Sequence, residues 1–175
     1  MITGQDISNA AIDSGLLGTP YSKLDCQAFV EEVLRDVGLP CNYRGSNHMW
    51  RDLVHDRGTV KNNSVPVGSL AFIVKRDGGE VKRGYHDDMG NATHVAIVID
   101  ETRVMESTTG GVQYGKLSRF TNYGLINGVI YEKGGYTNAG EGSTGAYEKL
   151  IRMIRILRDN VDGLEATIND IYRGT

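Results

Sequence analysis

Cys26 is the residue of this sequence best suited to covalent chemistry. It directly follows Asp25, a favourable helix N-cap, and Phe29 and Val33 continue the segment at helical spacing. Backbone N–H groups and the helix dipole at a helix start stabilise a thiolate, and they can also bind the oxyanion of a tetrahedral intermediate. A small cysteine can equally be buried at a helix start without any chemical role. Cys26 alone therefore leaves both interpretations open.

A thiol nucleophile needs a base, which is normally a histidine held by an orienting acceptor. Of the 4 histidines, only His94 stands at the beginning of a buried strand pattern, a continuous β-branched run over 93–99. Glu106 follows in a second strand pattern over 103–108, and the short turn between the two favours a hairpin. In that hairpin Glu106 can accept the second ring N–H of His94, which fixes the tautomer and favours the imidazolium. We therefore expect Cys26, His94 and Glu106 to form one catalytic site.

Periodicity predicts the elements that must position these groups. A helix over about 26–37 ends at Gly38 and Pro40, and a short helix is expected around 47–55. A turn-rich stretch over 57–68 follows. The strand patterns that come after it cover 70–74, 93–99, 103–108 and 126–132. One helix followed by a small, mostly antiparallel sheet predicts an α+β fold.

Three segments resemble the NlpC-type family of bacterial cell-wall cysteine peptidases. LDCQAFV at 24–30 resembles the family's Asp-Cys-Ser-Gly-Leu/Phe-Val helix start. VGSLAF at 67–72 resembles its Gly-Asp-Leu-Val-Phe strand, and HVAIVI at 94–99 resembles its His-Val-Gly-Ile-Tyr strand. Their order and spacing also fit, so the resemblance covers roughly residues 15–115.

The resemblance implies a papain-like fold, in which a helix bearing the cysteine packs on a small antiparallel sheet bearing the histidine. It also implies hydrolysis of an amide bond in bacterial peptidoglycan, with Cys26 as the nucleophile and His94 as the base. The family's third polar residue falls at Glu106. A glutamate there is more typical of the related cysteine, histidine-dependent amidohydrolase/peptidase group.

Two aromatic residues are candidates for substrate or oxyanion binding by the same resemblance. Family members carry a tyrosine ahead of the cysteine that hydrogen-bonds near the reacting centre, and Tyr21 is the candidate for it here. Trp50 lies in a segment that borders the cleft in the family, although an aromatic residue at helical spacing is also typical of a core. Gln27 and Ala28 depart from the family's Ser-Gly pair next to the nucleophile.

The C-terminal part of the chain differs from the rest. A glycine-rich segment at 134–145 has the composition of a linker and divides a domain over 1–133 from a helical pattern over 146–175. Seven apolar residues of that pattern keep a 4-3 heptad spacing: Leu150, Ile154, Leu157, Val161, Leu164, Ile168 and Ile171. The heptad is compatible with a helix docked on its own domain. It is also compatible with a coiled coil that makes the protein a homo-oligomer through residues 146–173.

Composition excludes several classes of protein. The 175 residues carry 19 Lys+Arg and 22 Asp+Glu, and a formal net charge of −3 is not the footprint of a nucleic-acid-binding protein. No apolar run approaches the roughly 20 residues of a transmembrane helix. The first residues show no signal peptide, since they lack a basic and an apolar region. We therefore expect neither nucleic acid nor a membrane as a partner.

No metal or other cofactor is expected either. His86, Asp87 and Asp88, together with His94, have metal-ligand chemistry, but their polar setting favours a solvated loop near the rim of the active site. The second cysteine, Cys41, is expected to be a passive thiol, because a disulfide between the two cysteines would consume the nucleophile.

The function expected from the sequence is that of a peptidoglycan hydrolase, which cleaves an amide bond of the stem peptide by Cys–His acyl transfer. A wall hydrolase without a signal peptide fits a phage or prophage lysin, released from the cytoplasm or carried on the virion, and it also fits a processed chain that has lost its leader. Two alternatives stay open. One is a papain-like amidase or transferase that acts on a non-wall substrate, and the other is a catalytically silent binding module.

Overall fold

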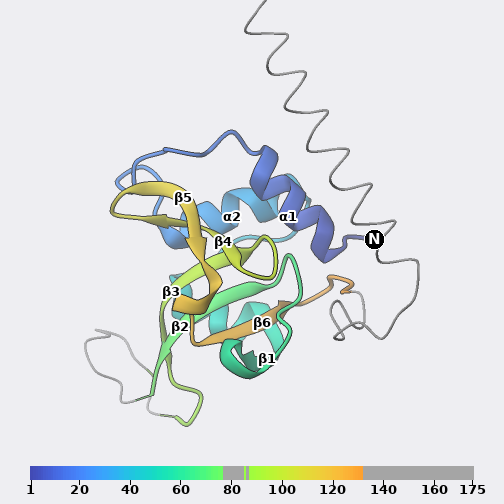
Figure 1. The fold of residues 1–175 in the computed structure, drawn as a ribbon, viewed down its shortest axis with the longest axis vertical. Coiled ribbons are helices and arrows are strands. Elements are labelled where there is room, and N and C mark those ends of the chain that lie inside the picture. Colours follow the sequence, from blue (N-terminus) through green and yellow to red (C-terminus); the bar gives the residue numbers. More distant parts are fainter. Residues whose placement is uncertain (77–84, 86, 132–175) are drawn as a thin grey trace, which may run out of the picture. The chain divides into compact units, whose positions relative to one another are not determined.

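A computed structural model describes residues 1–76, 85 and 87–131 of the chain. These residues form an α+β fold with helices and one six-stranded antiparallel sheet (Figure 1). The expected linker at 134–145 and the expected heptad helix over 146–175 lie outside the described residues. Both therefore stay predictions.

The two longer helices begin at side-chain caps. α1 (Gly4–Asp13) starts with a capping box, in which Asp6 N donates to Thr3 Oγ1 and Thr3 N donates to Asp6 Oδ2 at 2.8 Å. α2 (Cys26–Asp36) starts at Asp25, whose Oδ1 accepts from Ala28 N at 2.8 Å. A short α3 (Ser46–His48) runs on into the π-helical turn η1 (Met49–Leu53), and 3-10 turns form η2 (Val60–Asn62) and η3 (Leu117–Arg119). The helices predicted over 26–37 and around 47–55 are thus present.

The sheet has the strand order β1-β6-β2-β3-β4-β5, and every neighbouring pair is antiparallel. Its strands are β1 (Val54–Thr59), β2 (Leu70–Lys75), β3 (Asn91–Val98), β4 (Arg103–Thr108), β5 (Gly111–Lys116) and β6 (Asn122–Ile126). The predicted hairpin is β3–β4, and Asp100 shapes its turn by accepting from Thr102 N and Arg103 N. The predicted strand over 126–132 is wrong, because β6 ends at Ile126 and a turn with Gly128 at φ +79° follows.

Two apolar clusters cover the two faces of the sheet. Successive residues of β3 alternate between them, with Val95 and Ile97 in one cluster and Ala96 and Val98 in the other. The larger cluster lies under α1 and α2, which sit together over one face of the sheet (Figure 1). The smaller cluster contains Val65, Ala71, Ala96, Val98, Val104, Leu117 and Phe120. The central strands are therefore buried on both faces, whereas much of the edge strands β1 and β5 is exposed, and α2 is fixed on the sheet by its apolar side.

None of the helices within the described residues has the length and apolar character that crossing a bilayer requires.

Candidate active site

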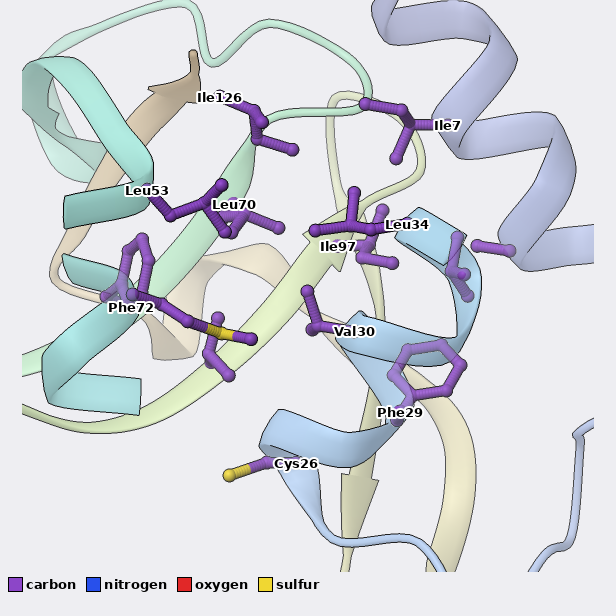
Figure 2. Packing of buried hydrophobic residues seen from close by; sticks show 14 of the residues in the cluster. Ile7, Cys26, Phe29, Val30, Leu34, Leu53, Leu70, Phe72, Ile97 and Ile126 are labelled. Atoms are coloured by element: carbon purple, nitrogen blue, oxygen red, sulfur yellow. The ribbon is translucent and has the colours of Figure 1, made fainter. Parts of the chain in front are cut away.

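Cys26 is the first residue of α2. Its relative exposure is 8 %, and Figure 2 shows it at the margin of the larger cluster, to which Val30 and Leu34 of the same helix belong. The N–H groups of the first residues of a helix have no acceptor within the helix. The N–H groups of Cys26 and Gln27 are therefore in position to donate to an oxyanion next to the thiol.

His94 and Glu106 lie on the same face of the sheet. β3 and β4 pair Ile97 with Met105 and Val98 with Val104. On this register Glu106 faces Ala96, and His94 lies one diagonal step away, within reach of a long side chain. His94 Nε2 and Glu106 Oε2 are hydrogen-bonded at 2.7 Å, and the two side chains are 16 % and 0 % exposed. The contact expected from the hairpin is present.

A β-bulge lies directly before His94. Ile73 pairs with His94 and Val74 pairs with Ala92, so that Thr93 is an extra residue in β3. Bulges of this kind bend a strand and redirect the next side chain. The imidazole then stacks on Phe120 with 5.7 Å between the ring centroids. The bulge and Phe120 together hold the ring where it meets Glu106.

The pKa of His94 reflects competing effects. Burial opposes the charged form and lowers the pKa, but hydrogen bonds with the side chains of Cys26 and Glu106, and the negative charges of both, raise it more strongly. The net effect raises the pKa of His94 from 6.5 to about 9. Since Nε2 is bonded to Glu106, Nδ1 is the ring nitrogen left for the thiol. At neutral pH the ring is therefore a cation between two acidic groups.

Glu106 has a second partner that sequence analysis missed. Arg119 Nη1, from η3, donates to Glu106 Oε1 at 2.7 Å. Space for the carboxylate comes from Gly115 on β5, where a β-carbon would lie only 2.0 Å from Oε1. Neither residue carries a local signal, because Arg119 is a surface arginine in a short turn and Gly115 one of 23 glycines.

A hydrogen bond joins the nucleophile helix to the strand of Glu106. The buried hydroxyl of Ser107 donates to the carbonyl of Leu24, in the segment just ahead of Cys26. Ser107 points to the opposite face from its neighbour Glu106. β4 thus orients His94 through Glu106 and fixes the start of α2 through Ser107.

Tyr21 lies next to Cys26. Burial and the charges of Cys26 and Asp25 raise the pKa of the Tyr21 phenol, which also has a hydrogen bond with the Cys26 side chain. Its ring is partly exposed. Tyr21 is therefore available both to the thiol and to a molecule bound beside it.

Trp50 does not take the place expected for a substrate contact. Its ring is buried, lies 5.1 Å from the Phe72 ring between centroids, and donates its Nε1–H to Met89 O at 3.1 Å. Because these contacts leave no surface that a substrate can reach, the expected binding role is corrected to a core role. Trp50 lies in the π-helical turn η1, in which Met49 and Leu53 are buried as well.

Cys41 is a free thiol away from this chemistry, and Cys26 is free as well. The Cys41 thiol donates to the carbonyls of Glu31 and Leu39, both at 3.2 Å. Burial and the charge of Glu31 raise the pKa of Cys41, which lowers its reactivity at neutral pH.

Within residues 1–76, 85 and 87–131, no three His, Cys, Asp or Glu side chains are arranged to hold a metal ion. His86, a member of the alternative metal cluster, lies outside the described residues. Its neighbour Asp87 is paired with Arg51 at 2.9 Å.

Comparison with known proteins gives a fold but no close relative. No family model matches the sequence, and no curated protein matches it. Among solved structures, the chain is similar to the NlpC/p60 domain of the peptidoglycan hydrolase SagA, with a TM-score of 0.52 and 19 % identity over 71 % of this chain and 98 % of that one. An NLP/P60 family protein of Staphylococcus aureus, described as similar to a lipoprotein, matches with a TM-score of 0.46 and 16 % identity, over 70 % of this chain and 41 % of that one. The first similarity confirms the fold that the sequence resemblance implied.

Proposed function

We propose that this protein is a cysteine hydrolase that cleaves an amide bond in the stem peptides of bacterial peptidoglycan. The observation that carries the proposal is the hydrogen bond between the His94 ring and the buried carboxylate of Glu106, together with the effect of the Cys26 thiol, at the start of α2, on the pKa of that ring. A thiol, an imidazole and an orienting acceptor are the parts that acyl transfer to a cysteine requires.

Each group has a role in the proposed reaction. The Cys26 thiolate attacks the amide carbonyl and forms a carbon–sulfur bond, while the N–H groups at the start of α2 stabilise the oxyanion. When the carbon–nitrogen bond breaks, the His94 imidazolium gives its proton to the leaving amine. Neutral His94 then takes a proton from water as that water attacks the thioester, and release of the acid regenerates the Cys26 thiolate. Glu106 holds the ring in one orientation throughout, and it fixes the tautomer when the ring is neutral.

Two further features support this chemistry. The raised pKa of His94 keeps the ring protonated at neutral pH, as a general acid must be before the leaving amine departs. The contact between Tyr21 and Cys26 adds a hydroxyl beside the reacting carbon. Peptidoglycan as the substrate is supported by the fold, which resembles the NlpC/p60 domain of a protein described as a peptidoglycan hydrolase.

The proposal is tested by digesting purified peptidoglycans of two wall chemistries and identifying the products by mass spectrometry. The matched variants are Cys26→Ala and Cys41→Ala, since both cysteines are free in the fold. New fragments with the wild type and Cys41→Ala, absent with Cys26→Ala, are the expected result, and their masses identify the bond. Equal digestion by Cys26→Ala would overturn the mechanism. If the wild type digests neither peptidoglycan although its Cys26 is alkylated rapidly, a non-wall amidase or transferase is favoured instead.

The finer expectations have their own tests. For a phage or prophage lysin, we expect the protein to reduce the turbidity of intact target cells when it is added from outside. For a C-terminal coiled coil over 146–173, light scattering at tens of micromolar should give an oligomeric mass, and a monomer would remove that proposal. A silent binding module would retain wall binding without products.

A further inference from the structure

We propose that Arg119 is a positioning residue of this site, which fixes the carboxylate of Glu106 in the orientation that His94 needs. The inference rests on the proposed function and deepens it. His94 Nε2 is bonded to Glu106 Oε2 at 2.7 Å, and Arg119 Nη1 donates to Oε1 at 2.7 Å. The two partners thus hold the two oxygens of one carboxylate and leave it a single orientation.

Glu106 needs such a partner because of where it lies. Its side chain is 0 % exposed, and Val104, its neighbour on the same face of β4, belongs to the smaller apolar cluster. An ionised carboxylate in such surroundings stays charged and ordered only when it is paired and hydrogen-bonded. Within the part of the chain that the structure describes, His94 and Arg119 are the basic side chains that pair with it.

Arg119 can take this role with little desolvation of its own charge. Its side chain is 51 % exposed, so its own charge stays largely hydrated while one N–H reaches the buried oxygen. The absence of a side chain at Gly115 leaves the space in which Oε1 lies. Arg119 is therefore placed to act on His94 through Glu106, rather than on the thiol directly.

The experiment compares the rate at which iodoacetamide alkylates Cys26, followed by peptide mass spectrometry, with kcat/KM for wall digestion. The variants are Arg119→Ala, Arg119→Lys and, as a matched control, Arg103→Ala. Arg103 is 52 % exposed and paired with Asp100, and within the described residues it has no hydrogen bond or ion pair with Glu106 or His94. We expect Arg119→Ala to lower both rates by about 10- to 100-fold, as is the case when a residue that orients a metal ligand through a hydrogen bond is removed. Arg119→Lys should keep most of the rate, and Arg103→Ala all of it.

Two further readouts separate positioning from a general effect on the fold. Millimolar guanidinium should restore part of the Cys26 alkylation rate in Arg119→Ala, because the half-exposed position opens to solvent, whereas the same concentration of sodium chloride should not. In a Glu106→Gln background, Arg119→Ala should cause no additional loss, because Arg119 acts through that carboxylate.

An unchanged Cys26 alkylation rate in Arg119→Ala would overturn the inference. So would a full additional loss of that rate when Arg119→Ala is added to Glu106→Gln. A rise in KM with kcat unchanged would also overturn it, because Arg119 would then be a substrate contact. If Arg119→Ala does not fold, Arg119→Gln replaces it. If Arg119→Gln and Arg119→Lys then show the same Cys26 alkylation rate, the positive charge of Arg119 has no part in positioning Glu106, and the inference is overturned. Alkylation needs no wall substrate. Failure of the proposed substrate would therefore leave this test intact.

Discussion

Replacing Gly115 with alanine should strongly lower the proposed hydrolase activity without changing any group that reacts. A β-carbon at this position would lie 2.0 Å from Glu106 Oε1 and 3.2 Å from Val104 Cγ2. A relaxed contact between nonbonded heavy atoms needs about 3.5 Å, so one atom must move by about 1.5 Å. The carboxylate is the movable end of its side chain, and it will move before the strand does.

The size of this displacement sets the expected loss. The bond between His94 Nε2 and Glu106 Oε2 is 2.7 Å long, and a shift of about 1.5 Å takes it beyond hydrogen-bond range. A misplacement of about 1 Å can cost about 100-fold in rate, and we expect kcat/KM of Gly115→Ala to fall by about that factor. The fold should lose only about 1–3 kcal/mol, as is usual for overpacking.

The assay is peptidoglycan digestion with the variant, alongside its melting temperature. Gly110→Ala is the control on the same hairpin, since its β-carbon would meet Gln113 Oε1 at an ordinary 3.5 Å. We expect Gly110→Ala to keep full activity. If folded Gly115→Ala were equally active, the carboxylate would have no part in positioning His94.

Three further predictions concern stability and contacts. Because the pKa of His94 rises from 6.5 to about 9 on folding, its protonation stabilises the fold fully below pH 6.5, and this contribution is lost as the pH rises to about 9. The stability difference between wild type and His94→Gln, from urea unfolding, should therefore shrink by up to about 3 kcal/mol between pH 6 and 10, and a constant difference would contradict the raised pKa. Trp50→Phe removes the bond to Met89 O and should cost about 1 kcal/mol with kcat/KM unchanged. A large rise in KM would instead return Trp50 to the substrate site. Ser107→Ala removes the bond to Leu24 O and should lower both stability, by about 1–2 kcal/mol, and the alkylation rate of Cys26; unchanged alkylation would show that Ser107 does not position α2.

The parts of the site that follow from local sequence could be predicted. Asp25 caps the helix that carries Cys26, and the short turn at Asp100 pairs the two strands that carry His94 and Glu106. Both signals depend only on residues within a few positions of each other. They suffice to bring His94 and Glu106 together.

The parts that depend on distant segments could not be predicted. Arg119 meets Glu106 only because η3 follows β5 at the edge of the sheet, and the extra residue Thr93 is defined only by its partner strand. The strands β1 and β5 are edge strands with mixed polarity, and they lack the continuous apolar run that identified β3. α1 buries Ile7 with small residues, which leaves a weak apolar stripe. The sequence could not tell whether Trp50 faces a cleft or a core.

The central claim is that Cys26 is an activated thiol, and competitive alkylation within one molecule tests it most directly. Cys26 is buried and Cys41 is only partly buried, so accessibility alone favours Cys41. Limiting iodoacetamide at pH 7, followed by peptide mass spectrometry, should label Cys26 at least about tenfold faster, because a protonated His94 beside the thiol activates it, whereas burial and Glu31 raise the pKa of Cys41. The same experiment on His94→Ala should remove that advantage. Equal or faster labelling of Cys41 in the wild type would contradict the account.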